Sequence, residues 1–538
     1  MGWISGFSRS ATWLLLAPLC AWAGPVARDA ELVQRGARIG NIEVEVDEVF
    51  ETTSQLGAPY RLANSLHIST QDSTVQQQLL FHTGDLYDRR VLDETARMLR
   101  AQRYLNEASV QPVRYNEADN TVDVLVKVHD VWTLSPGLSF GRKGGENSAR
   151  VKFEDANFLG RGKQLSFGRS SNVDRTAWEL GYVDPNVLGS WWKLSAGYSS
   201  LSDGSESMLS LERPFYAMDT RWSAGFSAGD ATTDVSRYSL GQVVERLQMQ
   251  HRRFEIGGGF SEGLRDGWTT RYLGGIRYDA REFQALPDEP GASIPSDRVV
   301  AYPWVGIEVL EDQYVSTRNL DQIGRTEDLY LGLSARLEAG FAAAALGSTH
   351  DGAILNGRLQ AGADLGNERY LINTLGFSTR IEGALANASL DWSSRYYLRQ
   401  SVHRVFFAAV SGVLTSHRDP EVQLLLGGDN GLRGYPLRYQ AGDASALVTL
   451  EQRFYTDWQP LKLFNVGAAV FFDAGRTWGR DEFAAAPAGW LKDIGVGLRL
   501  GSARSALGNV LHIDLAFPLD RSPDIDGLQL LVETRRSF

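Results

Sequence analysis

The residues best placed to do chemistry lie between Gly427 and Arg438, where the sequence reads GGDNGLRGYPLR. Gly431 and Gly434 bracket Leu432 and Arg433, so the backbone can adopt positive φ and lie close against another surface. If this stretch packs inside the protein, the Arg433 guanidinium loses water, and leaving it unpaired would cost several kcal/mol. The chemistry that the arginine offers is therefore a buried ion pair.

A strand predicted downstream supplies an acidic partner. One of its faces is apolar and the other is small or polar: Val466, Ala468, Val470, Phe472 and Ala474 against Gly467, Ala469, Asp473, Gly475 and Thr477. Such two-residue alternation is typical of the wall of a membrane barrel, in which Asp473 would point into the lumen. If the glycine-rich stretch folds back into that lumen, Asp473 is the natural partner of Arg433.

The sequence offers no catalytic site. Its eight histidines form no recognisable motif with a nearby serine, as a serine hydrolase would need. The string GGDN lacks the spaced carboxylates of a calcium loop. His67, His82 and His129 are interpreted as surface or capping residues. We therefore expect no enzyme, no cofactor and no metal.

Two motifs carry a resemblance to a known family. GLRGYP, with Gly431, Leu432, Arg433, Gly434 and Tyr435, resembles the lumen-inserted loop motif of the BamA, TamA and two-partner-secretion superfamily of outer-membrane assembly and translocation barrels. VFFDAGRTWG is similar to the barrel-wall motif whose aspartate meets the loop arginine in that superfamily. The resemblance assigns these roles to Arg433 and Asp473, although the family usually has valine where this chain has Leu432. GxRGY alone would also fit a glycine-rich hairpin with a solvated arginine.

Two further residues belong to the expected barrel wall. Gly475 shares the inward face of Asp473, and Glu451 has the inward phase of Thr449 and Arg453 in the preceding strand. Glu451 can join Arg433 or pair with Arg453, and the second interpretation is favoured.

The first residues have the pattern of an export signal. Arg9 precedes an apolar core from Ala11 to Ala17, and Ala21-Trp22-Ala23 supplies small residues for cleavage, so residues 1–23 are predicted as a signal peptide. Residues 24–38 would form a linker. A lipoprotein site at Cys20 fits less well because Leu19 precedes it. Cys20 is the only cysteine, so the cleaved chain could form neither a disulfide nor a thiolate metal site.

Composition narrows the class of protein. The net charge of -11 argues against nucleic acid as a partner. The negative mean hydropathy of -0.24 would suit a soluble protein, but a barrel escapes this test because every second residue faces water. The 55 glycines, 14 tryptophans and 19 tyrosines fit short turns and interfacial aromatic girdles. A secreted β-sandwich or propeller would share the glycine content.

Residues 39–131 combine strand and helix patterns, unlike the rest of the chain. Alternation at Ile42, Val44 and Val46 predicts a strand, two helical patterns follow, and a hairpin closes the unit. This order of strand, helix, helix, strand and strand, with LLFHTGDLY between the helices, resembles a periplasmic polypeptide-transport-associated (POTRA) domain. Residues 51–69 are longer than a minimal domain needs, and an extra short helix is possible at 59–68.

Residues 132–538 repeat the two-residue alternation and predict a mainly β fold, a transmembrane antiparallel β-barrel with a lumen-inserted loop at 417–441. The alternating windows include 192–199, 222–228, 254–260, 331–337, 353–363, 390–398, 494–500 and 511–519. The patterns give nearly 20 candidate strands, whereas the resemblance implies 16. Hairpins that rise beyond the bilayer could each be read as two strands, because only about 9 to 11 residues are needed to cross it. A barrel of 16 strands is therefore favoured, and one of 20 strands remains possible.

The last residues share one phase and end on Phe538. This resembles the terminal signal that the outer-membrane assembly machinery reads during insertion, and it also fits an ordinary closing strand.

Two functional classes follow. In the favoured one, the chain lies in the outer membrane of a Gram-negative bacterium, in contact with outer-membrane lipid and with the POTRA-like domain in the periplasm. That domain would bind an unfolded or secreted polypeptide client by adding a strand to its sheet, and the barrel would insert or translocate the client. The alternative is a passive or ligand-specific channel, which would not need such a domain.

Overall fold

The computed structural model describes residues 28–49, 67–485, 489–502, 504, 510–520 and 522–535. The predicted signal peptide, most of the segment 51–69 and the terminal Phe538 lie outside these ranges. Among the described residues, no helix combines the length and apolar character needed to cross a bilayer.

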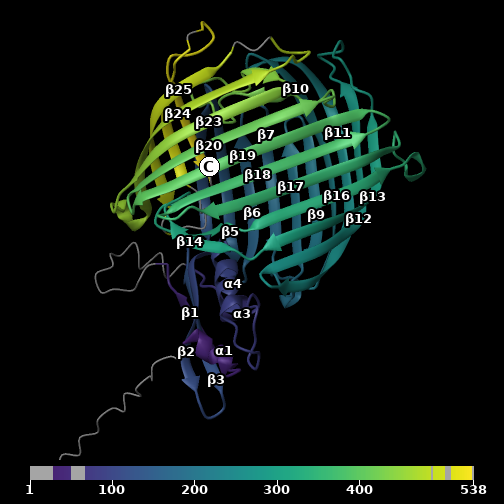
Figure 1. Ribbon diagram of the computed structural model, residues 1–538. Coiled ribbons are helices and arrows are strands. Elements are labelled where there is room, and N and C mark those ends of the chain that lie inside the picture. The colour runs from purple at the N-terminus through teal and green to yellow at the C-terminus, as the bar shows by residue number, and fades with distance from the viewer. Residues whose placement is uncertain are drawn as a thin grey trace, which may run out of the picture.

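A small N-terminal domain lies below one end of a large β-barrel (Figure 1). Its elements are α1 (Asp29–Gln34), β1 (Arg38–Asp47), α3 (Asp72–Gln76), α4 (Arg89–Arg100), β2 (Leu105–Asn116) and β3 (Thr121–Asp130). The sheet order is β1-β3-β2, with β1 parallel and β2 antiparallel to the central strand. Both β1 and β2 are therefore edge strands.

Helix α4 shows why this domain folds as it does. Asp88 caps its first turn by accepting a hydrogen bond from the amide of Arg90 at 2.9 Å. Leu92, Ala96 and Leu99 recur at helical spacing and are buried against the sheet. The preceding helix α3 ends at Gln76, so Leu79 of the predicted helical pattern is buried but lies beyond the helix.

The barrel is closed and has 20 strands. In chain order they are β4 (Leu134–Lys143), β5 (Glu146–Phe158), β6 (Lys163–Ser171), β7 (Thr176–Asp184), β8 (Lys193–Leu201), β9 (Gly204–Arg213), β10 (Trp222–Ser239), β11 (Gln242–Arg265), β12 (Trp268–Ala285), β13 (Arg298–Glu311), β16 (Leu333–Ala342), β17 (Gly352–Asp364), β18 (Arg369–Ile381), β19 (Leu385–Ser401), β20 (Arg404–Ser416), β23 (Ala444–Tyr455), β24 (Phe464–Trp478), β25 (Leu491–Ser502), β26 (Val510–Pro518) and β27 (Gln529–Arg535).

This strand number is the upper end of the predicted range and not the favoured 16. Tall hairpins do not explain the excess, because β10, β11 and β12 are single strands of 18, 24 and 18 residues. Five barrel strands follow the arginine-bearing connection and fifteen precede it.

The alternation in the wall strands separates an apolar outer face from a polar inner face. On β24 and β25, Val470 and Ile494 are exposed outward, whereas Asp473 and Asp493 are fully buried inside. The two aspartates are paired across the strands, so their side chains lie on the same face. These two strands thus carry Asp473 and Asp493 on the lumenal face.

The first and last barrel strands meet at a weak seam. Among the described residues, which end at Arg535, β27 and β4 are paired only at Val532 and Arg142. By contrast, the neighbouring strands β26 and β27 pair continuously from Val510–Arg535 to Ala516–Gln529.

Two long connections fold into the barrel from opposite ends. The end next to the N-terminal domain is called proximal here, and the other end distal. The arginine loop (residues 417–443) joins β20 to β23 at the distal end and contains β21 (Leu424–Leu426) and β22 (Gln440–Gly442). The proximal insert (residues 312–332) joins β13 to β16 and contains β14 (Tyr314–Arg318) and β15 (Thr326–Tyr330). Figure 1 shows β14 just above the N-terminal domain.

Candidate functional site

Arg433 lies at the centre of a charged cluster inside the barrel and is only 2% exposed. Its Nε and one terminal nitrogen donate to the two carboxylate oxygens of Asp473 at 2.7 and 3.1 Å. The other terminal nitrogen donates to Glu451 at 2.9 Å and to Asp514 at 3.2 Å. This is the fork geometry that guanidinium offers to carboxylates and that lysine cannot reproduce.

An aromatic side chain completes the Arg433 site. The guanidinium carbon lies 3.3 Å from the ring centroid of Phe471, which points inward from β24 and is itself buried. A cation over a ring face gains a further electrostatic attraction when water is excluded. The wall motif therefore contributes two residues, Asp473 and Phe471, to holding the arginine.

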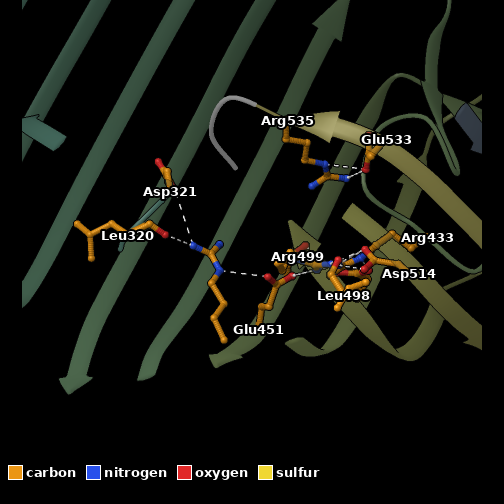
Figure 2. Close-up of polar contacts among 12 residues, drawn as sticks. Leu320, Asp321, Arg433, Glu451, Leu498, Arg499, Asp514, Glu533 and Arg535 are labelled. Atoms are coloured by element: carbon orange, nitrogen blue, oxygen red, sulfur yellow. Dashed lines mark hydrogen bonds and ion pairs between the residues drawn. The ribbon is translucent and has the colours of Figure 1, made fainter. Parts of the chain in front are cut away.

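Glu451 binds both Arg433 and Arg453, the two alternative partners that the sequence indicated. Besides Arg433, its carboxylate accepts hydrogen bonds from Arg453 at 3.1 Å and from Arg499 at 3.3 Å. Arg499 in turn contacts Asp514. Figure 2 shows Glu451 between Asp321 on one side and the group of Arg499, Arg433 and Asp514 on the other.

Asp514 and Arg499 were not identified from the sequence. Both belong to alternating strands, β26 and β25, and both have the inward phase. That phase was the available signal. It gives the face of a residue, but it does not say which strands lie opposite each other around the closed lumen.

The glycines of the loop motif allow close approach. Gly431 has φ 125°, and a Cβ there would lie 2.3 Å from the Cδ2 of Leu447. A Cβ on Gly434 would lie 2.6 Å from the Cβ of Asp493, so this position excludes any side chain. A Cβ on the wall residue Gly475 would lie 3.3 Å from the Cδ2 of Leu432. The glycines on loop and wall therefore let the two backbones approach each other.

Apolar and polar contacts hold the rest of the motif. Leu432 and Tyr435 are fully buried in one cluster with Leu426, Tyr439 and Leu491. The Tyr435 hydroxyl lies 2.7 Å from the Lys492 carbonyl and 2.8 Å from a carboxylate oxygen of Asp520, so its single hydrogen can be donated to either, and it accepts a hydrogen bond from the Lys492 amide at 2.8 Å. The motif is thus packed on its apolar side and hydrogen-bonded at its polar end.

Ion pairs fix both ends of the arginine loop to the distal wall. Asp419 binds Arg380 at 2.7 Å, and Glu421 binds Arg281 at 2.7 Å. At the other end, Arg438 binds Asp174 at 2.6 Å. Because several wall strands hold the loop, its position is set by the closed barrel as a whole.

The arrangement is an ionic lock in which guanidiniums face carboxylates. Within the described ranges, no three histidine, cysteine or carboxylate side chains are arranged to hold a metal ion. The lumenal charges instead cross-link a loop to four wall strands, because Glu451, Asp473, Arg499 and Asp514 come from β23, β24, β25 and β26.

Comparisons with known proteins give distant similarities. No protein-family model matches the chain. A curated relative, a putative outer membrane protein assembly factor of Treponema pallidum (strain Nichols), is 24% identical over 210 residues, which are 38% of this chain and 24% of that protein. The match therefore spans about a quarter of that relative's length.

Three solved barrels are similar to the chain. BamA from Haemophilus ducreyi lacking POTRA domains 1–3 is 14% identical with a TM-score of 0.39, over 92% of this chain and 84% of that one. CdiB from Acinetobacter baumannii is 12% identical with a TM-score of 0.46, over 93% and 73%. CdiB from Escherichia coli is 13% identical with a TM-score of 0.46, over 92% and 76%.

The closed barrel, the loop folded inside it and the loop arginine bound to a wall aspartate bring the sequence motifs together in space. In these features the chain resembles the BamA, TamA and two-partner-secretion superfamily of outer-membrane barrels.

Proposed function

We propose that this protein is an outer-membrane barrel that inserts or translocates a polypeptide client. The client would be an unfolded outer-membrane protein or a secreted chain, received by the N-terminal domain in the periplasm of a Gram-negative bacterium. The resemblance described above supports this class of function, and so does the outward apolar surface of the barrel. Val470, Ile494 and Val496 are all nearly half exposed on that surface, as lipid-facing side chains would be.

The observation that carries the proposal is the seam between β27 and β4. A cavity of about 940 Å³ runs through it. Its lining includes the inward residues Lys143 and Glu533, which form an ion pair at 2.5 Å, and the outward residues Leu511 and Val532. In the part of the chain that the structure describes, this cavity thus joins inward and outward side chains where the pairing between neighbouring barrel strands is shortest. A passive channel gains nothing from such a seam, whereas a polypeptide inserter needs a lateral opening.

The N-terminal domain is docked where a client would have to enter. Arg103 binds Glu154 of β5 at 2.5 Å, and Arg90 binds Asp219 in the turn after β9. The carboxylate of Glu94 accepts a hydrogen bond from the amide of Met218 at 2.8 Å, and burial raises the pKa of this group. The edge strands of the domain would accept an extended client by strand addition.

Locking the seam tests the proposal. Val532→Cys with Arg142→Cys, in a chain with Cys20→Ser, places two cysteines at directly paired positions. In proteoliposomes, the oxidised full-length protein should lose the ability to insert an unfolded eight-stranded outer-membrane barrel or to move an unfolded secreted polypeptide. Reduction should restore whichever activity the unlocked protein has.

The matched control is a wall staple, Glu212→Cys with Gly225→Cys, which joins the paired strands β9 and β10 away from the seam. This staple should leave activity unchanged in oxidant. If neither polypeptide is ever handled and small solutes pass equally through locked and unlocked barrels, the passive channel takes the place of the proposed function.

A further inference from the structure

The connection between β13 and β16 is far longer than a turn between antiparallel strands requires, since about two to five residues suffice. Its hairpin is paired from Tyr314–Tyr330 to Arg318–Thr326. Leu320, Ile323 and Leu331 are almost completely buried, in one cluster with inward side chains of the wall that include Tyr397, Phe407 and Tyr455. The proximal insert is therefore a packed element of the lumen.

The inner end of the proximal insert is bonded to the arginine network. Arg453 donates to the Leu320 carbonyl and lies 3.7 Å from the carboxylate of Asp321. The Tyr397 hydroxyl also lies 3.2 Å from both Asp321 oxygens. Because Arg453 also binds Glu451, and Glu451 binds Arg433, the insert is linked to the arginine loop through the Arg453–Glu451 pair of β23. Figure 2 shows this row from Leu320 and Asp321 to Arg433.

The outer end of the same insert is bonded to the N-terminal domain. Arg100 of α4 donates to both carboxylate oxygens of Asp328 at 2.7 Å, and both side chains are only 14% exposed. Arg325 donates to the Leu105 carbonyl at 2.7 Å, and the Thr326 amide donates to Glu107 at 3.0 Å. These last two contacts cover the beginning of β2, which is an edge strand of the domain's sheet.

We propose that the proximal insert is a latch that closes the proximal end of the lumen and is released by an extended polypeptide bound along the β2 edge. Such a polypeptide would compete with the insert for the start of β2, where a cavity of about 370 Å³ is lined by Asn106, Ser109 and Arg325. Withdrawal of the insert removes Leu320 and Asp321 from Arg453, so Arg453 is left to bind Glu451 more strongly and competes there with Arg433. Binding at the domain is thereby coupled to the lock on Arg433.

The identity of the releasing polypeptide rests on the proposed function, but closure by the insert does not. Potassium chloride conductance of the full-length protein in planar bilayers therefore serves as the readout, because it needs no client. A protein that gates normally yet handles no polypeptide would contradict the proposed function alone.

A reversible disulfide holds the latch shut. A Cβ on Gly501 of β25 would lie 3.1 Å from the Cβ of Ile323, slightly shorter than the usual disulfide separation of about 3.5–4.5 Å. Ile323→Cys with Gly501→Cys, again with Cys20→Ser, should oxidise readily and lower the open probability about tenfold, and reduction should restore it. The wall staple at 212 and 225 has a similar Cβ separation of 3.0 Å and should change nothing.

Breaking the outer contact should have the opposite effect. Asp328→Ala removes a charge-assisted pair and should raise the ratio of open to closed time about tenfold. Asp288→Ala, which removes an exposed partner of Arg246 at the distal end, is the matched control. The latch is overturned if the 323–501 disulfide does not form, if it forms without lowering conductance, or if Asp328→Ala gates like the unmodified protein.

Discussion

Arg433 and Asp473 are separated by 40 positions in the chain and form a two-pronged ion pair in the middle of the barrel, at 2.7 and 3.1 Å. Neither side chain reaches solvent. The pair therefore depends on the loop remaining inside, and the loop depends on the pair.

The first prediction is a double-mutant cycle on this pair. Arg433→Ala and Asp473→Ala should each lower barrel stability by about 3–5 kcal/mol, because each removes one charge from a buried cluster and leaves the remaining charges unbalanced. The double variant should be less harmful than the sum of the two. Heat-modifiability on gels and urea unfolding measure the effect. The exposed pair of Arg252 and Glu282 is the control, with about 0–1 kcal/mol expected. Additive effects at Arg433 and Asp473 would contradict the lock.

Gly434→Ala tests whether loop and wall must be in close contact. The added methyl would lie 2.6 Å from the Cβ of Asp493, so the loop has to shift, at a cost of about 1–3 kcal/mol. Trypsin should then cleave at Arg433 faster than in the unmodified protein. Gly291→Ala is the control, since a Cβ there meets nothing within 4 Å and should leave cleavage unchanged. Equal cleavage of both variants would argue against the packed loop.

Thiol labelling reports the orientation of the wall strand. Phe471 and Asp473 face the lumen, but the arginine loop covers both and they are almost fully buried. A water-soluble reagent should therefore miss Phe471→Cys in the intact barrel and label it when Arg433→Ala frees the loop. Val470→Cys should react only with a lipid-soluble reagent, because Val470 is exposed on the outer face. Labelling of 470 from water would mean that the register is shifted by one residue.

The latch should respond to pH through Glu327. Its carboxylate accepts hydrogen bonds from the amides of Leu320 at 2.8 Å and Asp321 at 2.9 Å. Burial, and then the nearby charge of Asp321, raise the pKa of Glu327 to about 7 from its ordinary value of 4.5. Arg453 faces Asp321 from β23 and offsets part of this charge.

The pKa of Glu327 is higher in the docked insert than in a released, solvated insert, so protonation favours docking. Docking is therefore strongest below about pH 4.5 and weakens as pH rises to about 7. Open probability in planar bilayers should therefore increase across this interval and level off above it. Glu327→Gln should abolish the dependence. A decrease with rising pH would contradict this assignment.

Much of the central pair could be predicted because it depends on local patterns. Alternation in the strand around Asp473 gives the inward face, and the bracketing glycines around Arg433 indicate a packed loop. Asp514 and Arg499 could not be assigned in the same way, since their contact with Arg433 depends on the curvature and closure of the whole barrel. Glu451 had two candidate partners and binds both, because a carboxylate can accept from several guanidiniums.

The strand number and the proximal insert show the limit of periodicity. Alternation alone counted nearly all of the strands, and the resemblance shifted the preference to 16. In the insert, β14 and β15 have 5 residues each and resemble any short strand. Nothing in a two-residue period tells whether a hairpin joins the wall or folds into the lumen, since an apolar face suits either position. The difference lies in long-range contacts with Tyr397 and Arg453.

Deletion of residues 39–131 tests the central claim most directly, that the N-terminal domain delivers a polypeptide to the barrel. The barrel closes through its own strands, so the truncated protein should still enter outer membranes as a heat-modifiable barrel. It should conduct ions more often than the full chain, because the insert loses its contacts with Arg100 and Leu105. It should no longer insert or secrete a polypeptide in cells. If the truncated protein supports the full cellular phenotype, the account is contradicted and the barrel acts as a channel by itself.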